Sequence, residues 1–337
     1  MHFSLSSLLM SILFSNLLLI LLYYVFRNTN FMMDIGCELL TVFLVATAVR
    51  FLFPFELFFT TNIYFPETVS RFLVFLKDPI FSLGSLSFSV WHLFLAVWFV
   101  GIVVRGYTVF HSYHIFYKGI RVFGRNVTSE EPYRSIISAI CQEQQRKNCF
   151  RITAIPKLSS PMITGLRNPR ILIPGDLALE PQDWYYILRH ETAHYFHHDL
   201  WLKLCTQIFC ILYWWNPFLY LLERQVSTML ELRIDQDATT SADTEGRYQY
   251  MKCLLRVATH EKKRSDTFGI FFCSNESLLM QRFQMISNGD SHKKNRRKQI
   301  MLSTLIAGIY LFSTFFIFEP HYISPEAVGK SFEITPE

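Results

Sequence analysis

Four long runs of apolar residues lie near the two ends of the chain. They cover residues 7–26, 36–55, 83–104 and 300–318. About 20 apolar residues in a helix cross the hydrocarbon core of a bilayer. The pattern therefore predicts four transmembrane helices, three within residues 1–104 and the fourth within residues 299–318. Arg50, near the end of the second run, is expected to extend its side chain toward the membrane interface.

The region between the third and fourth runs, residues 105–298, alternates between helical and strand-like patterns. In chain order we expect a helix over residues 130–146, a strand over 150–155, a turn over 161–165, a strand over 170–173 and a helix from Pro181 to about His198. Proline is favoured in the first turn of a helix, and alternating apolar residues are typical of strands. This region is therefore expected to be a folded domain with a small β-sheet.

A further run, residues 201–222, is almost wholly apolar and long enough for a fifth span. A full crossing would place the residues after it on the other side of the membrane from the helix before it. We therefore expect a helix that is buried in the domain or embedded in the cytosolic leaflet.

The basic residues indicate how the chain is oriented. Residues 105–298 hold 27 of the 32 lysines and arginines, including clusters beside the third and fourth runs. Lys and Arg near membrane spans mark the cytosolic side. We expect a multi-pass protein of the bacterial plasma membrane, with residues 105–298 in the cytosol. The N-terminus and a short tail, residues 319–337, are then extracellular.

The composition agrees with a mainly α-helical membrane protein. The chain is 51% hydrophobic and only 18% charged, against about 25% charged residues in an average soluble domain. The net charge of +5 is modest, and the basic clusters flank apolar segments, where anionic lipid is the expected partner. No direct nucleic-acid binding is expected. The seven cysteines form no Cys-x-x-Cys pair, which argues against a structural zinc ribbon.

The sequence His190-Glu191-Thr192-Ala193-His194 is a His-Glu-x-x-His motif. On a helix, His190 and His194 lie on one face and can bind the same zinc ion. Glu191 then lies close enough to act as general base toward a water molecule. Apolar residues flank the motif, at Trp184, Ile187, Leu188, Ala193 and Phe196. Such a helix is usually buried, and burying these polar groups without a purpose is unfavourable. The alternative is an amphipathic helix with incidental histidines.

A catalytic zinc usually takes three protein ligands and keeps one position open. The downstream segment 223–238 offers four acids: Glu223, Glu231, Asp235 and Asp237. Glu231 and Asp235 are four residues apart and share a helix face. We expect Glu231 to bind one catalytic Zn²⁺ and Asp235 to hold the imidazole of a ligand histidine. The alternative is that these acids form a solvated helix face.

Five segments together resemble the beta-lactam sensor and antirepressor family of membrane metallopeptidases, the Bla-type and Mec-type signal transducers. These segments are Arg50-Phe-Leu-Phe-Pro-Phe-Glu56, Ser160-Pro-Met-Ile-Thr-Gly-Leu-Arg-Asn-Pro-Arg-Ile-Leu-Ile-Pro174, the His190–His194 motif, Tyr213-Trp-Trp-Asn-Pro-Phe218 and Glu231-Leu-Arg-Ile-Asp235. Their order and spacing are similar to the family's over most of residues 1–318.

The resemblance implies a gluzincin-type fold with Glu231 as the third zinc ligand. It implies that the strand of Arg170, Ile171, Leu172 and Ile173 borders the cleft and pairs with an extended substrate. It also implies cleavage of the protein itself, of a cytosolic transcriptional repressor, or of both, in response to an envelope signal. Arg282 and Phe283 fall in a region similar to the one where family members are cut. A homodimer is a further expectation.

The sequence departs from the classical sensors after the fourth span. Those sensors continue into a large extracellular penicillin-binding domain, whereas the tail here has about 19 residues and no Ser-x-x-Lys motif. Direct acylation of this chain by a beta-lactam is therefore not expected.

Three other classes of protein stay open. A processing peptidase that resembles the HtpX or prenyl-protein protease group would use the same His-Glu-x-x-His chemistry. A non-catalytic membrane signalling scaffold could retain the fold, and loss of activity on changing Glu191 alone would separate it from an enzyme. A transporter would need ionisable residues well inside several spans, and only Glu38, Arg50 and His92 are candidates.

Overall fold

A computed structural model describes residues 5–28, 31, 34–52, 61–64, 66, 68, 70, 75, 79–83, 86–240, 242–268, 276–288 and 295–319. The chain divides into two compact units, residues 1–22, 42–104 and 300–337 in the first, and residues 23–41 and 105–299 in the second. Residues 23–41, which precede the domain boundary predicted at residue 104, thus group with residues 105–299 in the structure.

Three helices in the described part of the chain are long and apolar enough to cross a membrane: Leu8–Arg27, Val90–Phe123 and Arg296–Phe315. The first belongs to α1 (Leu5–Arg27), and the other two are α5 and α12. The second predicted span corresponds to α3 (Cys37–Leu52), whose 16 residues extend about 24 Å, short of a hydrocarbon core of about 30 Å. The rest of that run, residues 53–55, lies outside the described residues.

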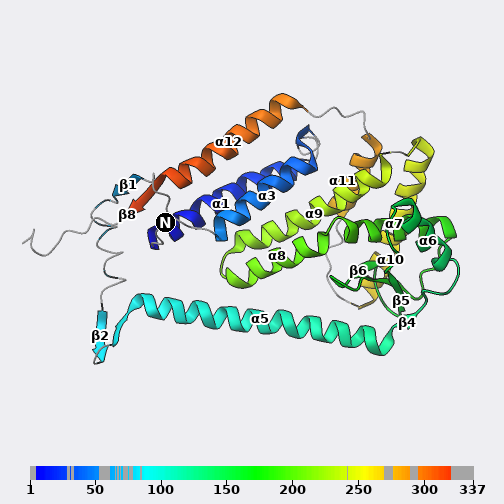
Figure 1. Ribbon diagram of the computed structural model, residues 1–337, viewed down its shortest axis with the longest axis horizontal. Coiled ribbons are helices and arrows are strands. Elements are labelled where there is room, and N and C mark those ends of the chain that lie inside the picture. Colours follow the sequence, from blue (N-terminus) through cyan, green and yellow to red (C-terminus); the bar gives the residue numbers. More distant parts are fainter. Residues whose placement is uncertain are drawn as a thin grey trace, which may run out of the picture. The chain divides into compact units, whose positions relative to one another are not determined.

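The third predicted span has different bounds in the structure. Residues 83–89 are not helical, because β2 (Pro79–Leu83) pairs with β3 (Leu86–Ser89) in antiparallel register. The helix begins at Val90 and continues to Phe123, drawn in Figure 1 as one unbroken ribbon. No proline interrupts residues 105–123, and a basic residue such as Arg105 does not end a helix. Its 34 residues extend about 51 Å, more than a bilayer core requires.

In the first unit, Arg50 does not reach toward an interface as expected. It is only 3% exposed, and its guanidinium donates to the Ser313 carbonyl oxygen of α12 at 2.6 Å and to the Ser313 hydroxyl at 3.2 Å. The Ser11 hydroxyl of α1 donates to the Arg50 carbonyl oxygen. A charge with these partners is tolerated among apolar helices. The β-strand Thr61–Tyr64 (β1) pairs in parallel with Phe316–Glu319 (β8) in the same unit.

The second unit contains a four-stranded sheet in the order β4-β5-β7-β6. Its strands are Arg125–Asn126 (β4), Arg151–Ile155 (β5), Met162–Thr164 (β6) and Arg170–Pro174 (β7). The turn predicted over residues 161–165 is instead the edge strand β6, which pairs antiparallel with β7. The bend after it falls at Gly165, whose φ of +90° disfavours a side chain.

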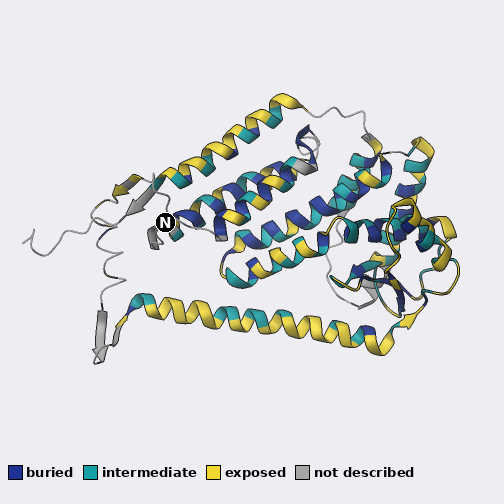
Figure 2. Cartoon of the chain, viewed as in Figure 1, coloured by how far each residue is buried: buried dark blue, intermediate teal, exposed yellow. Residues whose placement is uncertain are grey.

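The apolar core of this unit lies between the sheet and two helices, α6 (Tyr133–Glu143) and α7 (Pro181–Phe196). The core residues include Ile137, Ile140, Ile152, Ile171, Ile173, Trp184, Ile187 and Leu188, each at most 6% exposed. In Figure 2 the residues of the sheet and of α7 are mostly dark blue or teal, that is, buried or intermediate. The consecutive buried residues of β5 and β7 and the apolar face of α7 therefore fix how the motif helix packs against the sheet.

Among the described residues, four more helices lie wholly within the second unit: α8 (Asp199–Leu212), α9 (Pro217–Thr239), α10 (Thr244–Phe268) and α11 (Glu276–Asn288). The apolar run 201–222 is therefore two helices and not one. The break falls at Asn216, whose side-chain oxygen accepts from the Phe218 backbone N–H at 3.0 Å and caps α9. Pro217 then opens the first turn of α9.

Residues between α1 and α3 are joined to the first turn of α12 within this unit. The Lys298 ammonium donates to the buried Asp34 carboxylate at 2.5 Å. The Asn295 backbone N–H donates to the Asp34 carbonyl oxygen, and the Gln299 side chain to the Ile35 carbonyl oxygen. Lys298 also lies over the Phe31 ring, 5.4 Å from its centroid. Direct polar contacts therefore link two segments more than 250 residues apart in the sequence.

Candidate metal centre

The His-Glu-x-x-His motif occupies the last two turns of α7, as predicted. Trp184, Ile187 and Leu188 face the core and hold the helix against the sheet. His190 is 8% exposed, Glu191 8% and His194 4%. Burying three such side chains is unfavourable unless they have partners or a ligand.

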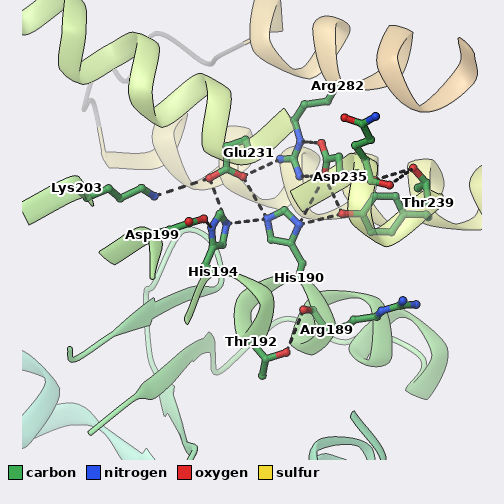
Figure 3. Close-up of polar contacts among 12 residues, drawn as sticks. Arg189, His190, Thr192, His194, Asp199, Lys203, Glu231, Asp235, Thr239 and Arg282 are labelled. Carbon is green, nitrogen blue, oxygen red and sulfur yellow. Dashed lines mark hydrogen bonds and ion pairs between the residues drawn. The ribbon is translucent and has the colours of Figure 1, made fainter. Parts of the chain in front are cut away.

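Glu231 of α9 completes a three-residue cluster with the two histidines. The Nε2 atoms of His190 and His194 lie 3.2 Å apart. The Glu231 carboxylate lies 3.2 Å from the His190 Nε2 and 3.6 Å from the His194 Nε2. Two ligand atoms at about 2.0–2.1 Å from a tetrahedral zinc are about 3.3 Å apart. Figure 3 shows the three side chains converging from two helices.

This donor set fits the metal that the sequence predicts. Two imidazoles and one carboxylate are a set typical of catalytic zinc, and they leave one coordination position free. The hydrogen bond from His190 and the positive charge of Arg282 hold the pKa of Glu231 well below its usual range, although burial alone would raise it. An ionised Glu231 is the form that binds a cation.

The second nitrogen of His190 is held by a chain of two hydrogen bonds. Its Nδ1 lies 2.9 Å from the hydroxyl of Tyr250 in α10, and that hydroxyl donates to the Asp235 Oδ1 at 2.7 Å. Asp235 is fully buried and itself lies 3.5 Å from the His190 Nδ1. The predicted role of Asp235 is therefore performed mainly through Tyr250. Burial and the charge of Asp235 raise the pKa of Tyr250 well above its usual value, so that it keeps its proton.

Arg282 of α11 closes this network. Its Nε and Nη2 atoms donate to the two Asp235 oxygens at 2.6 and 2.8 Å, and its Nη1 lies 3.7 Å from Glu231. Such two-point pairing with a carboxylate is strong and directional. Arg282 and Phe283, expected in a region of self-cleavage, lie in the middle of α11. A peptidase binds its substrate extended, so cleavage at this bond would require α11 to unwind.

His194 is held from the opposite side by Asp199. Its Nδ1 lies 2.8 Å from the Asp199 Oδ2, and Arg233 of α9 pairs with the other oxygen of this carboxylate. Asp199 is 1% exposed. The chain reverses at His198, in the left-handed conformation with φ of 61°, which turns Asp199 back toward the motif. The orientation of the His194 imidazole is thus fixed by a direct acidic partner, and that of the His190 imidazole by Tyr250, which is itself bound to an acid.

A cavity of about 970 Å³ opens onto the cluster. Its walls include His190, Glu191, His194 and Glu231, residues Ser160–Ile163 at the sheet edge, and parts of α9, α10 and α11. Burial, and to a lesser extent the charge of Glu231, raises the pKa of Glu191, while His194 lowers it. A raised pKa brings a carboxylate closer to the basicity that a general base needs at neutral pH.

The predicted substrate-pairing strand is wrong in one respect. Arg170–Ile173 belongs to β7, which pairs with β5 on one side and with β6 on the other. The backbone N–H and C=O groups of β7 are hydrogen-bonded to strands on both sides, so β7 cannot pair with a substrate as a further strand. The edge strand next to β7 is β6, and its residues Met162 and Ile163 line the cavity.

Comparison with known proteins agrees with the resemblance read from the sequence. A family described as BlaR1 peptidase M56 matches residues 83–286, more than half of the chain. The methicillin resistance mecR1 protein of Staphylococcus aureus is 23% identical over 190 residues, 54% of this chain and 32% of that protein. The regulatory protein BlaR1 of Bacillus licheniformis is 22% identical over 224 residues, 66% of this chain and 37% of that protein.

The chain thus aligns with about a third of either relative's length. The matched region 83–286 includes the metal cluster, its outer partners and the sheet edge. On this match, the chain belongs to the BlaR1 peptidase M56 family.

Proposed function

We propose that this protein is a membrane-bound zinc endopeptidase of the gluzincin type. The observation that carries the proposal is the convergence of His190, His194 and Glu231 at the spacing of a tetrahedral site, with Glu191 beside them on the cavity wall. When bound there, zinc would act as a Lewis acid and make a water molecule acidic enough to lose its proton near neutral pH.

The residues of the chain would divide the work as follows. His190, His194 and Glu231 hold the ion, and Glu191 takes the proton of the attacking water and delivers it to the leaving amine. Asp199 and the Tyr250–Asp235 pair keep the two imidazoles in the tautomer that presents Nε2 to the cavity. Because the site is buried, Glu191 works in an environment that strengthens its electrostatic interactions.

An extended substrate would add to the sheet at β6. This strand is at the edge of the sheet and lines the cavity beside the metal cluster. Backbone hydrogen bonds to such an edge bind a peptide with little regard to its side chains, while pockets along the cavity supply selectivity.

The physiological role proposed for this activity is that of an antirepressor. Similarity to the family supports cleavage of the protein itself, of a cytosolic repressor, or of both, on an envelope signal. The region around Arg282 and Phe283 is the proposed place of self-cleavage. The test is to map the ends of the proteolytic fragments that form in wild type and are absent in Glu191→Gln. Cuts confined to other regions would dismiss self-cleavage near Arg282 and Phe283.

The proposed setting is the bacterial plasma membrane. Residues 105–298 face the cytosol, the two termini lie outside, and residues 201–222 lie in the cytosolic leaflet without crossing it. The outer face of α8 supports the placement in the leaflet, because Trp201, Cys205 and Ile208 are exposed at helical spacing.

The metal content of detergent-purified protein tests the catalytic proposal. Wild type should hold about one zinc per chain, and His190→Ala and Glu231→Ala should lose it, since a catalytic site needs three protein ligands. Glu191→Gln should keep the zinc and lose peptide hydrolysis. Wild type without zinc after purification free of chelators, or Glu191→Gln with full activity, would overturn the proposal.

A further inference from the structure

Gln225 is a buried polar side chain on the wall of the metal cavity. It belongs to α9 and is 5% exposed. Among the described residues, neither its amide nitrogen nor its amide oxygen has a hydrogen-bond partner. A buried unpaired amide costs about 1–3 kcal/mol, so its presence at this place calls for a physical explanation.

The position of Gln225 relates it to the metal cluster. It precedes the ligand Glu231 by six residues on the same helix, which is about 9 Å along the helix axis. An extended peptide advances about 3.3 Å per residue. A peptide that runs along α9 with its scissile bond at the cluster would therefore pass Gln225 about three residues away. Beyond Gln225 the wall continues to Tyr23 and Phe26 at the end of α1.

The chemistry of the amide narrows the class of ligand. A primary amide has an N–H donor side and a carbonyl acceptor side, and both are unpaired here. A carboxylate or phosphate would satisfy only the donors, and a lipid chain would satisfy neither side. A peptide backbone supplies both a carbonyl oxygen and an N–H, so it can pair with the whole group.

We propose that Gln225 is a positioning residue that binds the substrate backbone about three residues from the bond that is cut. This inference rests on the proposed peptidase function and names a subsite for it. In the unliganded site both amide atoms are shielded from solvent, so pairing with a peptide requires the side-chain torsions of Gln225 to rotate the amide toward the cavity. Because the amide has no partner to give up, its hydrogen bonds to the peptide are gained in full.

The test uses probes that need no knowledge of the natural substrate. Acetohydroxamate binds an active-site zinc and carries no peptide. Two peptide hydroxamates, each with four alanine residues, extend from the zinc-binding group toward the amino side or the carboxyl side of a substrate. Binding of all three to zinc-loaded protein is compared between wild type and Gln225→Met, which keeps the length of the side chain and removes its hydrogen bonds.

In Gln225→Met, we expect one of the two peptide hydroxamates to bind about 5- to 100-fold more weakly, the range for one or two lost hydrogen bonds. Acetohydroxamate binding and zinc content should not change, and the melting temperature should stay equal or rise. Gln236→Met, on the same helix but away from the cavity walls, is the matched control. Should the Met variant not fold, Gln225→Asn, which keeps a shorter amide, should show a smaller loss of the same probe.

Two results would overturn the inference. Unchanged binding of both peptide hydroxamates in Gln225→Met would mean that the amide serves only packing or an internal water. Equal weakening of acetohydroxamate and the peptide probes would mean that the substitution disturbs the metal centre. Failure of wild type to bind acetohydroxamate would instead remove the proposed function, and with it this subsite.

Discussion

Replacing Asp199 by asparagine changes the support of one zinc ligand without touching the ligand itself. Asp199 is 1% exposed, and its carboxylate accepts from the His194 Nδ1 at 2.8 Å. Asparagine has nearly the same shape and can still accept this hydrogen bond through its side-chain oxygen. It loses the negative charge that makes the bound imidazole a stronger metal ligand and that pairs with Arg233.

The expected loss of zinc affinity follows from these contacts. Removing an outer partner of a metal-bound histidine typically weakens metal affinity 10- to 100-fold, about 1.4–2.7 kcal/mol. A charge-assisted hydrogen bond is about twice as strong as a neutral one, and asparagine keeps the neutral part. We therefore expect a loss of about tenfold for Asp199→Asn and of about 100-fold for Asp199→Ala.

Zinc affinity is measured by competition with a chromophoric chelator in detergent at fixed pH. Asp237→Asn is the control, because Asp237 pairs at 3.0 Å with His197 and both side chains are more than 40% exposed. Exposed ion pairs contribute about 0–1 kcal/mol to stability, and the Asp237–His197 pair does not contact the zinc ligands. The zinc affinity of Asp237→Asn should therefore equal that of wild type. If folded Asp199→Asn and Asp199→Ala bind zinc as tightly as the control, the assigned role of Asp199 is refuted.

Two further predictions concern the stability of the second unit and its placement at the membrane. Arg282→Met leaves the fully buried Asp235 without its two-point partner and should lower the free energy of unfolding by about 3–5 kcal/mol. Arg125→Met, at an exposed ion pair, should change the free energy of unfolding by less than about 1 kcal/mol, and equal melting temperatures of the two variants would contradict this reasoning. In native membranes opened to the cytosolic side, a water-soluble maleimide should label the exposed Cys149 and not Cys205, which is exposed on the outer face of α8. Equally fast labelling of both cysteines would place α8 outside the lipid.

The sequence was sufficient for the parts of the site that depend on helix periodicity. The spacing within the His190–His194 motif and the apolar face around Trp184 predict a buried helix with two ligands on one side, as the structure has it. Glu231 lies on the downstream helix that its segment predicted. In each case the relation between residues is set within a single helix, so that residue spacing alone describes it.

The parts of the site that the sequence does not predict depend on contacts between distant segments. Tyr250 and Arg282 reach the site from α10 and α11, and no spacing rule relates them to the motif. The role of Asp199 as a partner of His194 can be predicted only if it is known that the chain reverses at His198. The sheet edge was misread because Pro161 and Gly165 suggest a turn, whereas pairing with β7 makes the residues between them a strand.

The contacts around Asp34 have a mechanical consequence. Lys298, Asn295 and Gln299 attach the first turn of α12 to the short connection that follows α1. The buried Asp34 carboxylate resists separation from Lys298, because parting them would leave its charge without a counter-charge. We expect spin labels on the two segments to keep a fixed distance, and a broad distance distribution would show the joint to be loose. The joint therefore ties the start of α12 to a point seven residues after the end of α1, the helix whose Tyr23 and Phe26 line the metal cavity.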